Sequence, residues 1–289
     1  MCRFALYLGD PIGLDSLLTI PDHSIVMQSL DSRERSSPVN GDGFGVAFYV
    51  PSRASEPVLF RSVTPAWSNT NLTSLAHVAR SGCILAHVRA ASPGIPVAEM
   101  NCHPFVHGRL SFMHNGGLGD FRKLRRALSA RLSDRAFDVI QGTTDSELLF
   151  ATFLDALGLE ARGGAGDRMA NALERMAGVV REVMDERGVT ATSVLNCAVA
   201  DGEEAAVLRW ASDPSISASL YVHTGRRYTC EGTVCRMVDP DEGKGAVLVC
   251  SEPLSDDPGW DPVPVQHVVV IHPDRIVTVR PVREAPSRS

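Results

Sequence analysis

The sequence predicts an α+β layered domain. Runs rich in aromatic and β-branched residues occupy both ends of the chain, whereas amphipathic helical patterns are confined to its middle. Strands and helices do not alternate one by one, as they do in a doubly wound parallel sheet. Because no internal repeat is visible, we expect a single domain over residues 2–289.

The first part of the chain is expected to form four strands. They cover residues 2–8 (CRFALYL), 43–50 (GFGVAFYV), 83–88 (CILAHV) and 109–114 (RLSFMH). Residues 31–42 are polar and predict a loop. Residues 89–104 carry three prolines, which exclude a continuous helix.

Helices follow in the middle of the chain, and strands return after them. Apolar positions three or four apart predict helices at 120–132, 144–157 and 167–187, with the Gly-rich stretch 158–167 as an inter-helix loop. The later strand-like runs are 190–200, 205–211, 218–223, 246–250, 267–271 and 275–281. Residues 51–82 and 225–245 show no clear pattern, and we expect loops there that set substrate specificity.

Composition narrows the function classes. A net charge of -6 over 289 residues argues against a nucleic-acid partner, because such partners are held by an excess of Lys and Arg. No apolar run reaches 18 residues and no signal peptide is visible, so we expect a cytoplasmic protein without a membrane partner. The seven cysteines are odd in number and scattered without a CxxC pair, which does not indicate a disulfide framework.

Cys2 follows the initiator methionine directly. A single cysteine is more often a small buried hydrophobe than a nucleophile. However, a small second residue permits removal of Met1, which would leave an α-amino group with a pKa near 8 beside the thiol. Such a nucleophile would carry its own base.

Four further clusters could carry chemistry: NGDGFG at 40–45, AHVRAAS at 86–92, HNGG at 114–117 and TTDSE at 143–147. Each has a purely structural explanation when taken alone. Asn115-Gly116 is a common hairpin turn, and Thr144 with Glu147 forms a capping box that leaves Asp145 only loosely explained. Arg89 at the end of a strand fits a surface ion pair.

Other chemistries have less support. GDGFG lacks the glycine spacing of dinucleotide sites, no GK[ST] follows it, and no GxSxG elbow indicates a serine hydrolase. His103 and His107 have helical ligand spacing, but Pro104 lies inside it, and Cys230 with Cys235 is a weaker pair. We therefore expect neither a metal nor another cofactor.

Taken in order, MCRF, NGDGFG, AHVRAAS, NCHPF, HNGG and TTDSE resemble the class II glutamine amidotransferases of the N-terminal nucleophile hydrolase superfamily. The resemblance covers roughly residues 1–157. It implies a four-layer αββα sandwich of two mainly antiparallel sheets, with Cys2 at the start of an inner strand. It also implies hydrolysis of the γ-amide of glutamine or of a γ-glutamyl conjugate through a γ-glutamyl thioester.

The resemblance also implies a role for each matching residue. Cys2 is the nucleophile, and Asn115 and Gly116 are the donors to the oxyanion. Substrate binding falls to four residues: Arg89 to the α-carboxylate, Asp145 to the α-ammonium, and Ser92 and His114 beside them. Several family members have an arginine where this chain has Asn40-Gly41-Asp42, so Arg3, Arg33 and Arg35 stay alternatives for an arginine near Cys2.

The chain ends at Ser289, soon after the last predicted strands, and we expect no appended synthase domain. It therefore resembles the stand-alone members of the family, which include a γ-glutamyl amidohydrolase of ergothioneine biosynthesis and a subunit of a fungal glutathione-degrading complex. Two alternatives stay open. One is a glutaminase subunit that delivers ammonia to a separate synthase or complex partner, and the other is an inactive γ-glutamyl-binding subunit.

Overall fold

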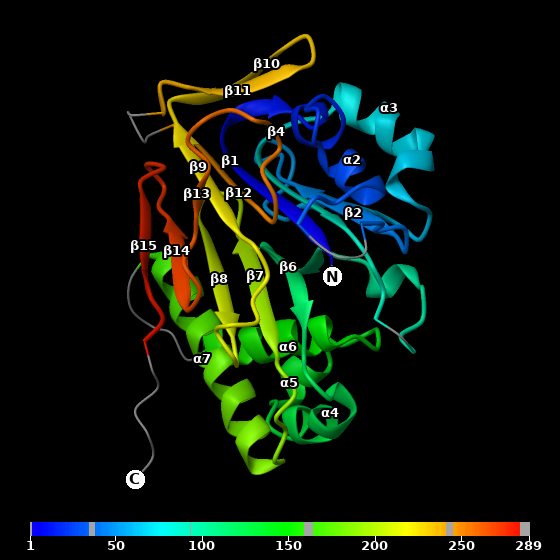
Figure 1. Cartoon of the computed structure of the whole chain (residues 1–289), viewed down its shortest axis with the longest axis vertical. Coiled ribbons are helices and arrows are strands. Elements are labelled where there is room, and N and C mark those ends of the chain that lie inside the picture. Colours follow the sequence, from blue (N-terminus) through cyan, green and yellow to red (C-terminus); the bar gives the residue numbers. More distant parts are fainter. Residues whose placement is uncertain (1, 35–37, 93, 159–163, 241–244, 284–289) are drawn as a thin grey trace.

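The computed structural model describes residues 2–34, 38–92, 94–158, 164–240 and 245–283 (Figure 1). Within them, two antiparallel sheets are stacked. The seven-stranded sheet has the order β13-β9-β12-β1-β4-β2-β3, and the six-stranded sheet has the order β15-β14-β8-β7-β6-β5. Strands far apart in the sequence lie side by side in both sheets, because β1 pairs with β12 and β6 pairs with β7.

The bounds of the elements are as follows. The seven-stranded sheet contains β1 (Arg3–Gly13), β2 (Phe44–Phe48), β3 (Val58–Ser62), β4 (Arg80–Val88), β9 (Tyr221–Gly225), β12 (Ala246–Cys250) and β13 (Asp261–Pro262). The six-stranded sheet contains β5 (Phe105–His107), β6 (Leu110–Gly117), β7 (Val194–Ala200), β8 (Ala205–Ala211), β14 (His267–Ile271) and β15 (Val277–Pro281). The helices are α1 (Asp15–Leu18), α2 (Ile25–Leu30), α3 (Thr70–Val78), α4 (Phe121–Ser129), α5 (Asp134–Phe137), α6 (Asp145–Gly158) and α7 (Ala165–Glu186), with 3-10 turns at η1 (Ala66–Ser68) and η2 (Glu99–Asn101).

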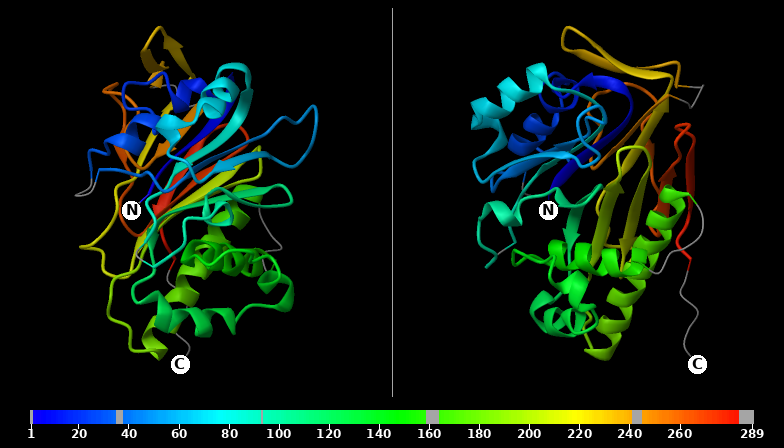
Figure 2. Two further views of the ribbon diagram at one scale, coloured as in Figure 1. Left: turned by 90° about the vertical axis from the view of Figure 1, so that its right-hand side faces the viewer. Right: turned by 180° about the vertical axis from the view of Figure 1, so that it is seen from behind.

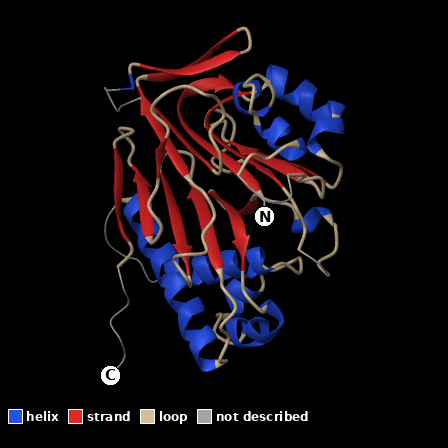
Figure 3. Cartoon of the chain, in the orientation of Figure 1, coloured by secondary structure: helices blue, strands red, loops and turns tan. Residues whose placement is uncertain are grey.

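Helices cover the outer faces of both sheets (Figure 3). α1 to α3 pack on the seven-stranded sheet, and α4 to α7 lie beyond the six-stranded sheet. The fold is therefore the expected four-layer αββα sandwich, and its α+β class is confirmed.

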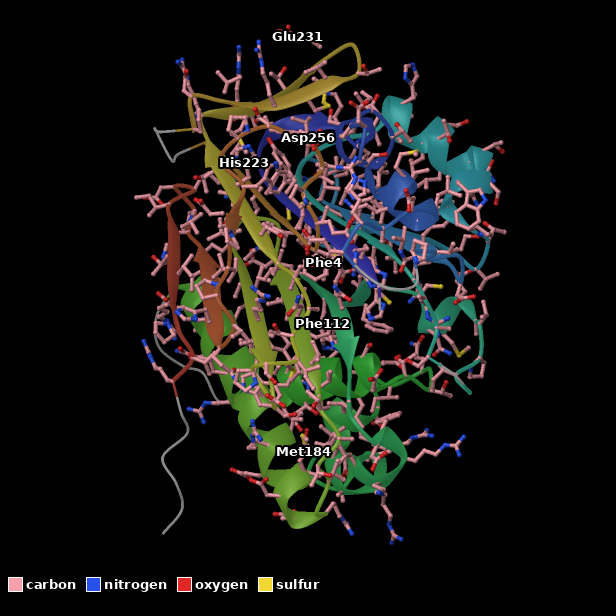
Figure 4. All side chains as sticks on the ribbon, in the orientation of Figure 1. Phe4, Phe112, Met184, His223, Glu231 and Asp256 are labelled. Atoms are coloured by element: carbon pink, nitrogen blue, oxygen red, sulfur yellow. A yellow bond between two sulfur atoms is a disulfide. The ribbon has the colours of Figure 1, made fainter. Side chains whose placement is uncertain are left out.

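β1 separates two of the three large apolar cores. Because side chains alternate along a strand, Phe4, Leu6 and Leu8 fill the space between the sheets, whereas Ala5 and Tyr7 face the layer of α1 to α3. Figure 4 labels Phe4 between the sheets, and Phe112 and Met184 nearer the α4 to α7 layer. In that third core, Phe112 stacks on Phe150 with ring centroids 5.2 Å apart.

The predicted strands and long helices are confirmed, most of them with shifted ends, and several elements were missed. The segment 51–82, expected to be a loop, contains β3, η1 and α3. The segment 225–245 contains a hairpin of β10 (Arg227–Glu231) and β11 (Val234–Val238). α6 and α7 flank the Gly-rich stretch as expected, although residues 159–163 lie outside the described residues.

The hairpin also corrects the interpretation of the cysteines. Cys230 and Cys235 face each other in the β10–β11 register and form a disulfide across it. The other five cysteines are buried and free. A spacing of five residues reveals such a pair only once the hairpin is known. No helix in the described ranges is both long and apolar enough to cross a membrane.

Candidate active site

Cys2 lies at the meeting point of the two sheets. It directly precedes β1, which pairs with β4 on one side and β12 on the other and also contacts β6 of the second sheet (Figure 2). The side chain is buried, and its thiol lies 3.7 Å from the carbonyl oxygen of Ala90. The loop that follows β4 therefore borders the sulfur.

The electrostatic surroundings of Cys2 keep it protonated at rest. Burial raises the pKa of its thiol, while the nearby charges of Arg89 and Asp145 act on that pKa in opposite directions. A thiol with a raised pKa is a poor nucleophile at neutral pH. Chemistry at this sulfur therefore needs an adjacent base.

Arg89 follows β4 and is almost completely buried, with 3% of its surface exposed. Its guanidinium donates to the carbonyl oxygens of Asp42 at 3.4 Å and Pro96 at 3.3 Å. In the described part of the chain no carboxylate lies within ion-pair distance of this guanidinium. The expected surface ion pair is thus replaced by a buried cation that a carboxylate ligand would neutralise.

Asp42 holds the loop that carries Arg89. Its carboxylate accepts the backbone N–H of Ala91 at 2.8 Å, and its own N–H donates to the Arg89 carbonyl at 3.0 Å. The NGDGFG cluster was singled out from the sequence, but Asp42 was assigned no task there. The structure assigns it the positioning of the loop after β4.

Asn115 and Gly116 lie on β6, opposite Asn196 and Leu195 of β7. They belong to a continuous strand, so the hairpin-turn interpretation is wrong. A side chain at Gly116 would approach the Val194 carbonyl oxygen within 1.9 Å, so close strand packing also demands glycine there. Asn115 is completely buried and its side-chain nitrogen donates to Ser251 Oγ at 3.1 Å.

Asp145 begins α6 beside a pocket of about 410 Å³ that Ser92 also lines. Its carboxylate accepts the N–H of Leu118 at 2.9 Å and that of Ser146 at 2.8 Å. These bonds tie the start of α6 to the end of β6. They place a carboxylate at the wall of a cavity large enough for an amino-acid head group.

The predicted capping box is only half present. The Thr144 hydroxyl accepts the Glu147 N–H at 3.1 Å, as expected. The Glu147 carboxylate instead accepts the N–H groups of Gln141 and Gly142, at 2.9 and 2.6 Å. Burial raises the pKa of Glu147, and the two backbone donors oppose that change.

His114 is bonded within the protein through both ring nitrogens. Its Nε2 lies 3.0 Å from the Val194 carbonyl oxygen and so carries the proton, while Nδ1, 2.9 Å from Ser146 Oγ, accepts a hydrogen bond. The ring is buried, and burial lowers the pKa of His114 although Asp145 and the Val194 carbonyl act against that change. The ring thereby holds the Ser146 hydroxyl at the start of α6.

The two histidines with helical ligand spacing, His103 and His107, have separate surroundings. His103 is buried with its ring centroid 4.1 Å from that of His87, whereas His107 is exposed on β5. Burial lowers the pKa of His87 to about 3. No cluster of three metal-ligating side chains was found among the described residues.

Two anchoring residues had little or no sequence signal. Asn101, inside NCHPF, accepts the Thr143 N–H at 3.0 Å and donates to the Pro96 carbonyl at 3.0 Å. It therefore joins the TTDSE cluster to the loop that follows β4. Glu252, which follows β12 by two residues, forms a buried ion pair with Arg3. Arg3 is therefore bonded to a protein carboxylate, and it also donates to the Cys2 carbonyl oxygen at 2.8 Å.

The other two candidate arginines have different surroundings. Arg33 pairs with the exposed Asp256, their closest atoms lying 3.5 Å apart. Arg35 lies outside the described residues.

Comparison with known proteins decides the family. The model of a family described as "Glutamine amidotransferases class-II" matches residues 15–288. This chain is a class II glutamine amidotransferase. It is thus an enzyme of that class, although the matched stretch begins after Cys2, so the assignment of the nucleophile depends on the MCRF motif and the geometry around it.

Two curated relatives cover nearly all of this amidotransferase. A probable glutamine amidotransferase of Saccharomyces cerevisiae, DUG3, is 39% identical over 96% of this chain and 83% of its own length. A gamma-glutamyl-hercynylcysteine sulfoxide hydrolase of Mycobacterium tuberculosis is 29% identical over 94% of this chain and 93% of its own.

Solved structures agree with the fold. A glutamine aminotransferase class-II domain protein from Silicibacter pomeroyi superimposes with a TM-score of 0.67 at 28% identity, covering 98% of this chain and all of that one. The glutamine phosphoribosylpyrophosphate amidotransferase of Bacillus subtilis matches with a TM-score of 0.60 at 15% identity. The match covers 99% of this chain but only half of the Bacillus chain, and it supports the fold alone.

Proposed function

We propose that this enzyme hydrolyses the γ-amide of glutamine or of a γ-glutamyl conjugate, with Cys2 as its nucleophile. The observation that carries the proposal is the pair of charges flanking the sulfur. Arg89 is a buried cation without an acidic partner among the described residues, and Asp145 is a carboxylate on the wall of a pocket. Opposite charges of this kind match the α-carboxylate and α-ammonium of a glutamyl head group.

Hydrogen bonds between carboxylates and backbone N–H groups hold Arg89 and Asp145 in position to bind such a head group. The loop after β4 is tied to Asp42, so Arg89 can offer a planar fork of two N–H donors to a carboxylate. Asp145 is oriented by the N–H groups of Leu118 and Ser146. A head group fixed at both ends would lie with its γ-amide over the sulfur, which lowers the entropy cost of the attack. Ser92 lines the same pocket and offers a hydroxyl to that head group.

The reaction proceeds in two halves. Once Met1 is removed, the α-amino group of Cys2 takes the thiol proton, and the sulfur attacks the γ-carbonyl carbon. The oxyanion accepts hydrogen bonds from the Asn115 side-chain nitrogen and the Gly116 N–H. The C–N bond then breaks, and the amine leaves with the proton taken from the thiol. Water adds to the resulting γ-glutamyl thioester, the C–S bond breaks, and glutamate and the free thiol are released.

We favour a γ-glutamyl conjugate over free glutamine as the substrate. The support is the hydrolase from Mycobacterium tuberculosis, named for a γ-glutamyl substrate, which aligns with this chain over more than nine-tenths of both lengths. In such a substrate the leaving group is a larger amine instead of ammonia.

The decisive experiment compares turnover of glutamine with that of a panel of γ-glutamyl amides, using Cys2→Ala as the control. We expect at least one conjugate to be hydrolysed faster than glutamine and Cys2→Ala to be inactive. In addition, 6-diazo-5-oxo-norleucine should alkylate the wild-type enzyme at Cys2, as located by peptide mapping. Retention of Met1 in the active enzyme, or full activity of Cys2→Ser, would contradict the mechanism.

The same screen tests the two alternatives. Glutamine turnover that rises only when a partner protein is added would favour an ammonia-delivering subunit. Absence of both turnover and alkylation would favour a binding subunit. We further propose that residues 2–289 form one amidotransferase domain, because strands from both halves of the chain pair within each sheet.

A further inference from the structure

The Asn115 side chain has an unusual hydrogen-bond pattern. This residue is completely buried on β6. Its nitrogen lies 3.1 Å from Ser251 Oγ, and its oxygen is buried without a hydrogen-bond partner among the described residues. Burying an amide oxygen without a donor is costly, so such an atom calls for an explanation.

Ser251 supplies the explanation. It directly follows β12 and is completely buried. Its Oγ accepts the backbone N–H of Phe4 at 3.1 Å. With that N–H as donor, the hydroxyl proton of Ser251 remains to be donated, and no acceptor for it is found in the described part of the chain except the Asn115 amide.

A half-turn of the Asn115 amide gives the Ser251 hydroxyl an acceptor and gives the Asn115 oxygen a donor. The two ends of an amide have nearly the same shape, so hydrogen bonds must decide which end is oxygen. After the half-turn, Phe4 N–H donates to Ser251 Oγ, and the Ser251 hydroxyl donates to Asn115 Oδ1. The Asn115 nitrogen then occupies the place of the unpartnered oxygen, with its hydrogens directed away from Ser251.

We propose that Ser251 is a positioning residue that holds the Asn115 amide with its nitrogen turned toward the oxyanion. This inference rests on the proposed function, in which that nitrogen is an oxyanion donor. Ser251 is the added group, and it decides which end of the Asn115 amide faces the oxyanion. Without the hydroxyl, the amide is free to present its oxygen, which repels an oxyanion.

The backbone of Ser251 is fixed firmly enough for this task. Its N–H donates to the Phe4 carbonyl at 2.9 Å, and its carbonyl accepts the Ser219 hydroxyl at 2.8 Å. Phe4 is only two residues from Cys2. One hydroxyl therefore links the strand of the nucleophile in one sheet to the strand of the oxyanion donor in the other.

The test is a double-mutant cycle on hydrolysis of a γ-glutamyl amide. Asn115→Ala should lower kcat by about 100- to 1,000-fold, as loss of one oxyanion donor does elsewhere. Ser251→Ala should lower kcat by about 10- to 100-fold with KM changed less than about twofold. Because Ser251 acts through Asn115, the double variant should be no slower than Asn115→Ala alone.

Two controls separate positioning from folding. Ser29→Ala removes another completely buried serine hydroxyl, one that bonds the Val26 carbonyl within α2 and not Ser251 or Asn115, and it should keep kcat within about twofold. The melting temperature of every variant is measured alongside. Should Ser251→Ala melt below the assay temperature, Ser251→Thr, which keeps the hydroxyl, takes its place and must retain kcat within about tenfold.

The outcomes distinguish the two proposals. Full activity of Cys2→Ala would overturn the proposed function and the role of Ser251 with it. If Cys2→Ala is inactive while folded Ser251→Ala keeps the wild-type kcat, only the role of Ser251 is overturned. Effects of Ser251→Ala and Asn115→Ala that multiply in the double variant would also overturn it, because independent residues behave in that way.

Discussion

Glu252→Gln should make the protein less stable at neutral pH but much less so in acid. Glu252 is completely buried, and its carboxylate pairs with Arg3 and lies 2.8 Å from His23 Nε2. It also accepts the backbone N–H groups of Arg33 at 2.8 Å and Glu34 at 3.2 Å. Glutamine has nearly the same shape but lacks the charge that all four contacts favour.

The size of the effect follows from the pKa of Glu252. Burial alone would raise it, but the contacts with His23, Arg3 and the two backbone N–H groups outweigh burial and lower it from 4.5 to about 2. At about 1.4 kcal/mol per pKa unit, this shift contributes about 3 kcal/mol to stability. Because the folded pKa is the lower one, the contribution is complete above pH 4.5 and is lost as the pH falls toward 2.

Urea unfolding at several pH values measures this directly. At pH 7 the free energy of unfolding of Glu252→Gln should fall short of the wild type by about 3 kcal/mol, and near pH 3 by about half as much. Asp256→Asn is the matched control, since Asp256 is exposed and its pairing with Arg33 should contribute little. A deficit for Glu252→Gln that stays constant from pH 7 to pH 3 would refute the electrostatic reasoning.

Three further predictions concern single features. Arg89→Lys keeps the charge but loses the two-donor fork, so steady-state kinetics should show KM for a γ-glutamyl amide rising by about 10- to 100-fold, and an unchanged KM would remove Arg89 from substrate binding. Gly116→Ala would press a methyl group onto the Val194 carbonyl, and denaturant unfolding should register a loss of about 1–3 kcal/mol, whereas wild-type stability would show that β6 and β7 can separate without cost. Replacing Cys230 and Cys235 by serine opens a short cross-strand loop and should lower the unfolding free energy by about 2 kcal/mol with kcat unchanged, whereas a large fall in kcat would connect the hairpin to the active site.

Much of the fold could be predicted because the strands bury one or both faces. The runs at 205–211, 246–250 and 267–271 are strands with those same bounds, since each is a short apolar stretch between turn residues. α1 and α2 were missed because they have four and six residues. Helices of that length are held by packing on β1 and β4 more than by their own periodicity.

The candidate site residues are visible in the sequence as short clusters, but the partners that their side chains bond are not. Cys2, Asn115 and Asp145 lie in short ordered clusters, so their grouping was visible along the chain. His114 lies in such a cluster as well, but its ring bonds to Val194, 80 residues away, which no local pattern reveals. Proximity in sequence to a functional residue did not fix the direction of this side chain.

By itself, the sequence determined the order of the strands and helices, the class of enzyme and the residue types available for the chemistry. These follow from patterns within a few residues, namely alternation, capping and clustered motifs. The tertiary structure decided which side chains hold the residues of the candidate site in place. Ser251 and Glu252 meet Phe4 and Arg3 because β12 pairs with β1 across almost the whole chain, and that register depends on the packing of both sheets.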